Sequence, residues 1–347
     1  MTRLMYYEWY KAFGGFKWLI IVVILIIKAV FTYQSLDVSV DFSIPIYREY
    51  ISELSEMSQS KAEKFILSEN ERINSVLGGY TEMESAYSSG KLSLEEYKAY
   101  IKIYHDAKSK ASAFNAVYQK HEQLSMLSNE NRIYFYDLEW YTFGEYMGLD
   151  FFAIFLIMIF TVPIFCREHS LNTHHLNMVC KNGRTKLHIT KLMLGFISGL
   201  VLGLLAYSID FAIFGLRYGF EYSDMPIQAV MGYSHNADNV SVLGMFAAMS
   251  VSKVLWCGCL ALMICGICAL LRNNIISVIM CAALLFFPMQ VLKLNENSPS
   301  WLYSISILSG LSGSKENIDI LTPLINTAIW IVINLLVTAT VYTKRRE

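Results

Sequence analysis

Two ionisable side chains, Asp210 and Lys253, fall inside long apolar stretches of the sequence. At 1.5 Å of rise per helical residue, they lie about 12 and 5 Å from the midpoints of their stretches, toward the same side of the membrane. A charge at such a depth costs roughly 2.5–3.5 kcal/mol unless it is paired or hydrated. We therefore expect an Asp210–Lys253 pair with a structural or gating role. The alternative is that each side chain reaches a wet interface separately.

A short polar segment, residues 167–191, separates two apolar stretches and holds five basic residues and one acid. Glu168 ends the first stretch, and Arg184 and Lys191 lead into the second. The apolar residues in this segment include Leu171, Leu176 and Met178. A short amphipathic helix, a turn and a basic helix start suit docking into a groove of another protein. A cytoplasmic hairpin held by phospholipid headgroups accounts for the same residues.

No pattern in the sequence indicates a metal site or an enzyme. Four of the seven cysteines lie within residues 242–271, an apolar stretch in which cysteine is usually a small packing residue. His174 and His175 are adjacent, so on a helix they point in different directions and lack the spacing of a zinc motif. The apolar stretches contain no pair of acids with a histidine, and no phosphate-binding loop motif occurs. We expect a non-catalytic chain without a cofactor.

Composition indicates a protein that crosses the membrane several times. The chain is 54% hydrophobic and 16% charged, against roughly 25% charge in soluble domains. Apolar residues form blocks long enough to cross a bilayer. We expect six spans, at residues 16–34, 147–166, 188–216, 242–271, 275–292 and 321–343. Lys28, toward the outer end of the first span, is expected to reach the headgroups.

Charge asymmetry assigns the sides of the membrane. The N-terminus, the segment 167–191 and the C-terminus are net basic, which indicates that they are cytoplasmic. Residues 35–145 contain 18 acids and 11 bases, which places them outside. The predicted organisation is an interface helix at 1–15, span one at 16–34, an extracellular helical domain at 35–145, and spans two to six within 146–347.

The predicted extracellular domain has a helical pattern of apolar residues, which recur at intervals of three and four. Ser93, with Glu96 three residues later, is a typical helix start. The simplest arrangement is two or three long helices that fold back as a hairpin, with charged runs on solvated faces. On span three, Gly195, Gly199 and Gly203 lie at four-residue spacing, which favours close helix packing.

One region resembles the matching region of type-2 ABC exporter permeases: residues 165–200, FCREHSLNTHHLNMVCKNGRTKLHITKLMLGFISGL. In that family a Glu after the second span precedes a short coupling helix, and an Arg and a Lys open the third span. Glu168, Arg184 and Lys191 match those positions. The layout is similar over nearly the whole chain, with an amphipathic N-terminal helix and six spans. The long insert at 35–145 departs from the short first external loop of the family.

The resemblance implies a plasma-membrane permease subunit that works with a separate ATP-binding subunit and a second permease, either another copy or a related chain. ATP and Mg²⁺ would then be bound by the partner. Contact with the ATPase would come from Glu168, Leu171, Leu176, Met178, Arg184 and Lys191. The external domain and mostly apolar spans suit an amphipathic, peptide or lipid-like substrate. No nucleic-acid partner is expected.

A second class of function explains the same composition. The chain would be a membrane sensor or scaffold that transports nothing. Its extracellular domain, residues 35–145, would bind a ligand or partner, and the basic segment 167–191 would signal inside the cell. Co-purification with an ATP-binding subunit distinguishes the exporter from the sensor.

Overall fold

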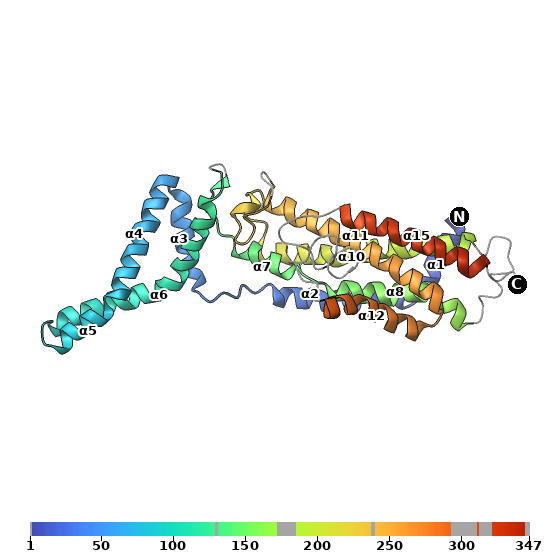
Figure 1. Cartoon of the computed structure of the whole chain (residues 1–347), viewed down its shortest axis with the longest axis horizontal. Helices are drawn as coiled ribbons and strands as arrows, with labels where there is room; N and C mark the ends of the chain where they lie inside the picture. The colour runs from blue at the N-terminus through green and yellow to red at the C-terminus, as the bar shows by residue number, and fades with distance from the viewer. Residues whose placement is uncertain are drawn as a thin grey trace. The chain divides into compact units, whose positions relative to one another are not determined.

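The computed structural model describes residues 2–128, 131–171, 185–236, 240–292, 311 and 321–343. Within these ranges the chain is helical, and the β contact is an isolated bridge between Pro226 and Ser241 (Figure 1). The predicted all-α class is confirmed for the described residues.

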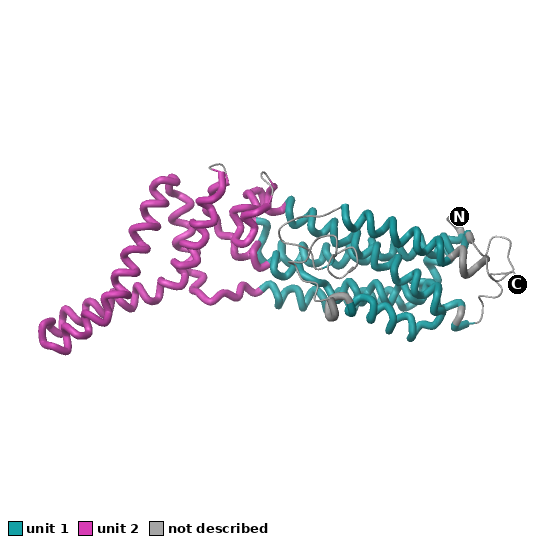
Figure 2. The backbone as a smooth tube through the Cα atoms, in the orientation of Figure 1, with its two compact units in different colours: residues 1–36, 143–220, 244–347 teal, residues 37–142, 221–243 magenta. Residues whose placement is uncertain are grey.

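The chain divides into two compact units, which Figure 2 colours separately. Unit 1 comprises residues 1–36, 143–220 and 244–347, and unit 2 comprises residues 37–142 and 221–243. Most of the predicted insert at 35–145 therefore belongs to unit 2. Sequence analysis did not anticipate that residues 221–243 would join it.

Unit 1 is built mainly from long helices, with a turn at Gly15 between the first two. Gly15 has a φ of 73°, a conformation that glycine adopts without steric cost. Helix α10 packs against α8, α2 and α1. The helices are α1 (Thr2–Phe13), α2 (Lys17–Ser35), α8 (Phe151–Ser170), α10 (Thr185–Tyr218), α11 (Val242–Leu271), α12 (Asn274–Leu292) and α15 (Leu321–Thr343), and α7 (Leu138–Tyr146) enters from unit 2.

Four segments are long and apolar enough to cross a membrane, which indicates a membrane-embedded protein. They are Lys17–Ser35, Leu138–Glu168, Lys186–Tyr218 and Val242–Leu271. Each overlaps one of the first four predicted spans. The described parts of α12 and α15 hold shorter apolar stretches, Asn274–Phe287 and Leu321–Val337.

The glycines of α10 bring that helix close to α11. A Cβ atom added at Gly199 would lie 2.6 Å from the carbonyl oxygen of Cys257. At Gly195 it would lie 2.4 Å from the Sγ of Cys265, and at Gly203 it would lie 2.8 Å from the Cβ of Cys257. The close packing predicted from the glycine spacing is confirmed. These two cysteines fill the interface between the helices.

Unit 2 has its own hydrophobic core, to which α3 (Ile44–Glu56), α4 (Gln59–Gly78) and α6 (Leu94–Ser125) contribute. The shorter helix α5 (Tyr80–Ser88) packs against α6. Ser93 and Glu96 form the predicted capping box at the start of α6, with both reciprocal hydrogen bonds present. Residues 227–229 form a 3₁₀ turn, η2 (Ile227–Ala229).

A fully buried ion pair lies inside unit 2. The Nζ of Lys120 lies 2.7 Å from Asp137, and both side chains are completely buried. The ammonium also donates to the carbonyl of Phe135 at 2.8 Å. Asp137 accepts from the hydroxyl of Tyr47 at 3.0 Å and from the backbone N–H of Met231 at 2.9 Å. The pair thus joins α6 to two loops, and Lys120 is an exception to the expectation of solvated charges.

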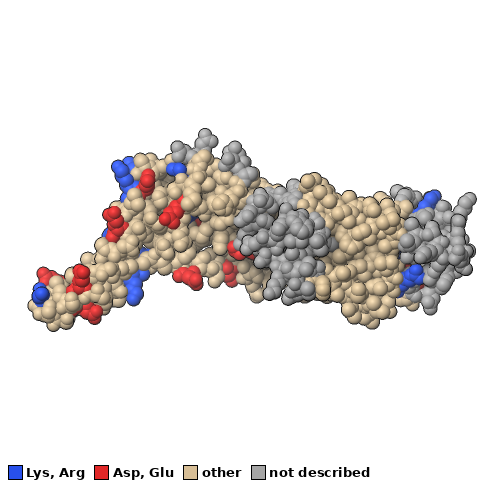
Figure 3. All heavy atoms as spheres, in the orientation of Figure 1, with Lys and Arg blue, Asp and Glu red and all other residues tan. Residues whose placement is uncertain are grey.

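Charged side chains are unevenly distributed over the described surface. On the face drawn in Figure 3, unit 2 carries both acidic and basic side chains along its length. The described surface of the long helices of unit 1 shows few, apart from basic residues near one end. Apolar side chains of α2, such as Val23, Ile27 and Val30, are half exposed. This composition fits contact with lipid.

Candidate functional site

The carboxylate of Glu168 joins three helices of unit 1. Glu168 lies in the last turn of α8 and is buried. Its Oε1 accepts from the Nζ of Lys11 on α1 at 2.5 Å. Its Oε2 accepts from the Nζ of Lys191 on α10 at 2.7 Å. One carboxylate with a cation on each oxygen therefore holds α1, α8 and α10 together.

The C-terminal end of α1 is fixed by further contacts. Lys11 also pairs with Glu8 at 3.2 Å. Its carbonyl accepts from Arg167 at 2.8 Å and from Lys17 at 2.8 Å. Cations are favourable at a helix C-terminus, where carbonyls lack partners within the helix. Glu8 is buried and Lys11 is partly buried, whereas aromatic residues such as Tyr6 are exposed.

Only part of the predicted ATPase-coupling set lies within the described residues. Glu168 and Lys191 are brought into direct contact. Leu171 is exposed at the end of α8. Leu176, Met178 and Arg184 lie outside the described residues. The predicted coupling set did not include Lys11, although the sequence shows this residue among aromatic side chains of a short amphipathic helix.

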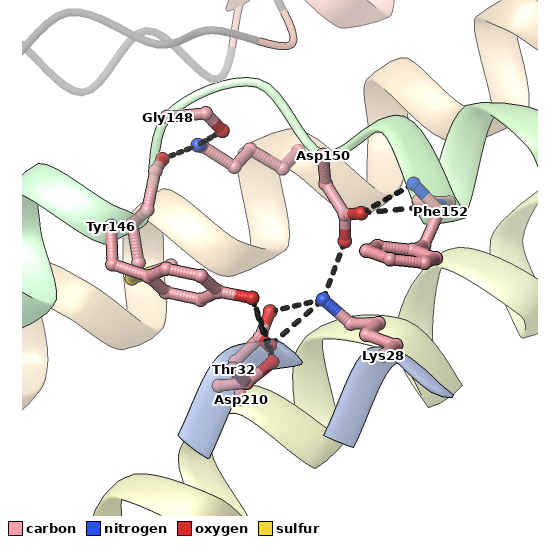
Figure 4. A network of polar contacts seen from close by, with 10 residues as sticks. Lys28, Thr32, Tyr146, Gly148, Asp150, Phe152 and Asp210 are labelled. Carbon is pink, nitrogen blue, oxygen red and sulfur yellow. Dashed lines mark hydrogen bonds and ion pairs between the residues drawn. The ribbon is translucent and has the colours of Figure 1, made fainter. Parts of the chain in front are cut away.

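A second charged cluster surrounds Lys28 on α2 (Figure 4). Its Nζ lies 2.7 Å from Asp150, which precedes α8, and 2.8 Å from Asp210 on α10. Lys28 is 0% exposed. The expectation that Lys28 reaches the headgroups is wrong, because two carboxylates inside unit 1 stabilise the ammonium where it lies.

Asp210 also accepts hydrogen bonds from two further side chains. The hydroxyl of Thr32 donates to its Oδ1 at 3.0 Å, and that of Tyr146 donates to the same oxygen at 3.2 Å. The two hydroxyl oxygens lie 2.7 Å from each other. Each hydroxyl has one proton, so a hydrogen bond between them replaces one of the bonds to Asp210. The carboxylate therefore has a cation and two hydroxyls around it, which offsets the cost of its burial.

Lys253 of α11 is also buried, and its ammonium donates to the carbonyls of Met147 and Gly148. The bond to Gly148 is 2.8 Å long. Lys28 is the ion-pair partner that the structure gives Asp210; the Asp210–Lys253 pair stays a prediction. The ammonium groups of both lysines lie 5.9 Å from the ring centroid of Tyr207. The buried cluster thus contains two lysines and two aspartates.

The described residues contain no group of three or more His, Cys, Asp or Glu side chains placed to hold a metal ion. The six cysteines within the described ranges are buried and are not in disulfides. Comparison of the chain with family models, with curated proteins and with solved structures found no match. The chemistry that the two clusters offer is ion pairing between helices.

Proposed function

We propose that this chain is the membrane permease subunit of an ATP-driven exporter of the type-2 ABC class. The observation that carries the proposal is the position of Glu168 between Lys11 and Lys191. The resemblance places a coupling helix directly after Glu168. A contact that ties the N-terminal helix to both helices flanking that segment suits the transfer of movement from a cytoplasmic partner.

In this proposal the chain has six spans, with α12 and α15 as the fifth and sixth. Both termini and residues 167–191 are cytoplasmic, and residues 35–145 are extracellular in the plasma membrane. The basic segment and the acidic insert support this orientation. The permease works as a pair, with a second copy or a related chain.

The mechanism we propose is coupling without catalysis in this chain. ATP and Mg²⁺ bind to the separate ATPase, and closure of that partner pushes on the segment that follows Glu168. The ion pairs of Glu168 convey the push to α1 and α10. An amphipathic, peptide or lipid-like substrate then passes between the two permeases. Such coupling requires two states that both partners bias.

The test is co-purification followed by ATPase measurement. The tagged chain is expressed with candidate ATP-binding subunits, and the complex is reconstituted in lipid. We expect Glu168→Gln to lower substrate-stimulated ATPase activity about tenfold while the complex still assembles. Glu71→Gln, the same change at an exposed position of α4, is the control. A chain that binds no ATPase, or full stimulation in Glu168→Gln, contradicts the proposal.

One observation favours the alternative of a sensor or scaffold. Unit 2 is a compact helical unit with its own core and a buried ion pair, as a separate ligand-binding domain would be. For a sensor, the full-length chain binds its ligand without any ATPase partner, and ATP causes no movement of substrate. Transport by the reconstituted complex excludes this alternative.

A further inference from the structure

A break interrupts one of the candidate spans. The apolar segment Leu138–Glu168 is long enough to cross a membrane as one helix. The structure divides it into α7, which ends at Tyr146, and α8, which begins at Phe151. A break leaves carbonyls at the end of one helix and N–H groups at the start of the next without partners inside the helix. Where water does not reach them, such groups must be satisfied by protein.

Charged side chains bind the backbone on both sides of this break. On the α7 side, the ammonium of Lys253 takes the carbonyls of Met147 and Gly148. On the α8 side, the Oδ1 of Asp150 accepts from the N–H groups of Phe152 and Ala153, at 2.9 and 3.1 Å. Each group has the charge that the helix end favours, a cation at the C-terminus and an anion at the N-terminus.

The two sides are held by different helices. Lys253 belongs to α11 and binds the backbone directly after α7. Lys28 belongs to α2, and its Nζ lies 2.7 Å from the carboxylate of Asp150, which caps α8. Figure 4 shows Lys28 directed at the carboxylate of Asp150, from the ribbon of another helix. A relative displacement of α2 and α11 would therefore change the angle between α7 and α8.

The link itself is suited to bending. A Cβ atom at Gly148 would have one contact within 4 Å, to the carbonyl of Glu145 at 3.7 Å, so the backbone there is not wedged by neighbours. An uninterrupted apolar helix would satisfy its backbone without any buried charge. The chain instead places four ionisable residues around the break. Buried charges are costly, and a break whose two helices must move relative to each other would explain why they are present.

We propose that residues 147–150 form a hinge between α7 and α8, latched by Lys253 on the α7 side and by Lys28 on the α8 side. Release of either lysine frees one helix end from its anchor. The proposal concerns motion of this chain by itself, so it stands or falls separately from the exporter function.

Hydrogen–deuterium exchange of the full-length protein in lipid nanodiscs tests the hinge. The reporter is the peptide that covers residues 147–154. We expect Lys253→Met and Lys28→Met each to speed its exchange by about tenfold, because the latched break opens more often. Peptides from the glycine-packed part of α10, residues 195–205, should gain much less than the reporter. Lys186→Met, which removes an exposed lysine at the start of α10, is the control.

A second variant guards against misfolding. Lys28→Met combined with Asp150→Asn removes the latch without leaving the lone carboxylate of Asp150, and asparagine still caps α8. The same rise in exchange at residues 147–154 is expected. Wild-type exchange at the reporter in every folded variant overturns the proposal. A rise of the same size throughout the helices of unit 1 also overturns it, since the lysines would then stabilise the bundle as a whole without acting on a hinge.

Discussion

Asp150 and Glu168 lie at opposite ends of α8, and each carboxylate accepts a lysine ammonium from another helix. The helical rise between them is about 27 Å, close to the thickness of a hydrocarbon core. On α10, Lys191 belongs to the cluster around Glu168, and Asp210 belongs to the cluster around Lys28. Two packed helices thus connect the clusters, so a shift of either helix changes both.

Loss of the Glu168 carboxylate should destabilise the bundle. Glu168→Gln leaves the buried ammonium of Lys191 without its anion, whereas Lys11 is partly exposed and can be hydrated. Removal of one partner of a buried pair costs about 3 kcal/mol. We expect a lower thermal unfolding midpoint in detergent for Glu168→Gln. Glu71→Gln, on the exposed face of α4, should leave the midpoint unchanged; equal midpoints for all three proteins would refute the pairing.

The Lys28 cluster should behave as one interacting set. Lys28→Met leaves two aspartates buried without their shared cation, at an expected cost of about 3–5 kcal/mol. Asp210→Asn alone leaves Lys28 paired with Asp150 and should cost less. When Lys28→Met and Asp210→Asn are combined, fewer unpaired buried charges remain than in Lys28→Met alone, so part of the loss of stability is recovered. A double-mutant cycle on thermal unfolding should therefore give a coupling of about 1–3 kcal/mol, and strict additivity would contradict the pair.

Close packing of α10 on α11 gives a steric prediction. Gly199→Ala places a methyl group 2.6 Å from the backbone oxygen of Cys257, which cannot move aside as a flexible side chain would. Overpacking of this kind costs about 1–3 kcal/mol, and we expect a lower unfolding midpoint. Gly78→Ala is the matched control, because no atom lies within 4 Å of its Cβ position. A Gly199→Ala variant as stable as Gly78→Ala would show that the helices are further apart.

Local patterns in the sequence were enough to predict much of the fold. Hydropathy predicted four apolar segments that the structure shows as candidate spans, and the pair Ser93 and Glu96 predicted the start of α6. The four-residue spacing of Gly195, Gly199 and Gly203 gave the packing face of α10. Each of these signals acts between residues that are close in sequence or depends on composition alone.

The partners of the buried charges were not predictable in the same way. Lys28 pairs with residues 122 and 182 positions away, and Lys11 pairs with a residue 157 positions away. No local period connects such residues. A signal for the helix break did exist: Gly148 and Asp150 stand directly before an apolar run, as a helix stop and an N-cap would. The predicted span two begins at residue 147 and residues 35–145 were assigned to the extracellular domain, so no helix was expected directly before the break.

The buried pair in unit 2 should make its stability depend on pH. Burial lowers the pKa of Lys120, while the neighbouring Asp137 acts in the opposite direction. Between this lowered pKa and the ordinary value of 10.5, the unfolded chain binds more protons than the folded chain, so this group's contribution to stability rises with pH. Asp137→Asn removes the charge that favours the ammonium, so the pKa of Lys120 falls further and the window widens downward.

We therefore expect the unfolding midpoint of Asp137→Asn, relative to wild type, to increase between pH 7 and pH 9.5 in a full-chain thermal scan. At pH 7 the variant should be less stable by about 3 kcal/mol, because a buried ammonium has lost its anion. Adding Lys120→Met should abolish the extra pH dependence, since no titrating ammonium remains. Parallel pH profiles for wild type and Asp137→Asn would mean that Lys120 does not titrate differently in the two folded proteins, against the ion pair seen here.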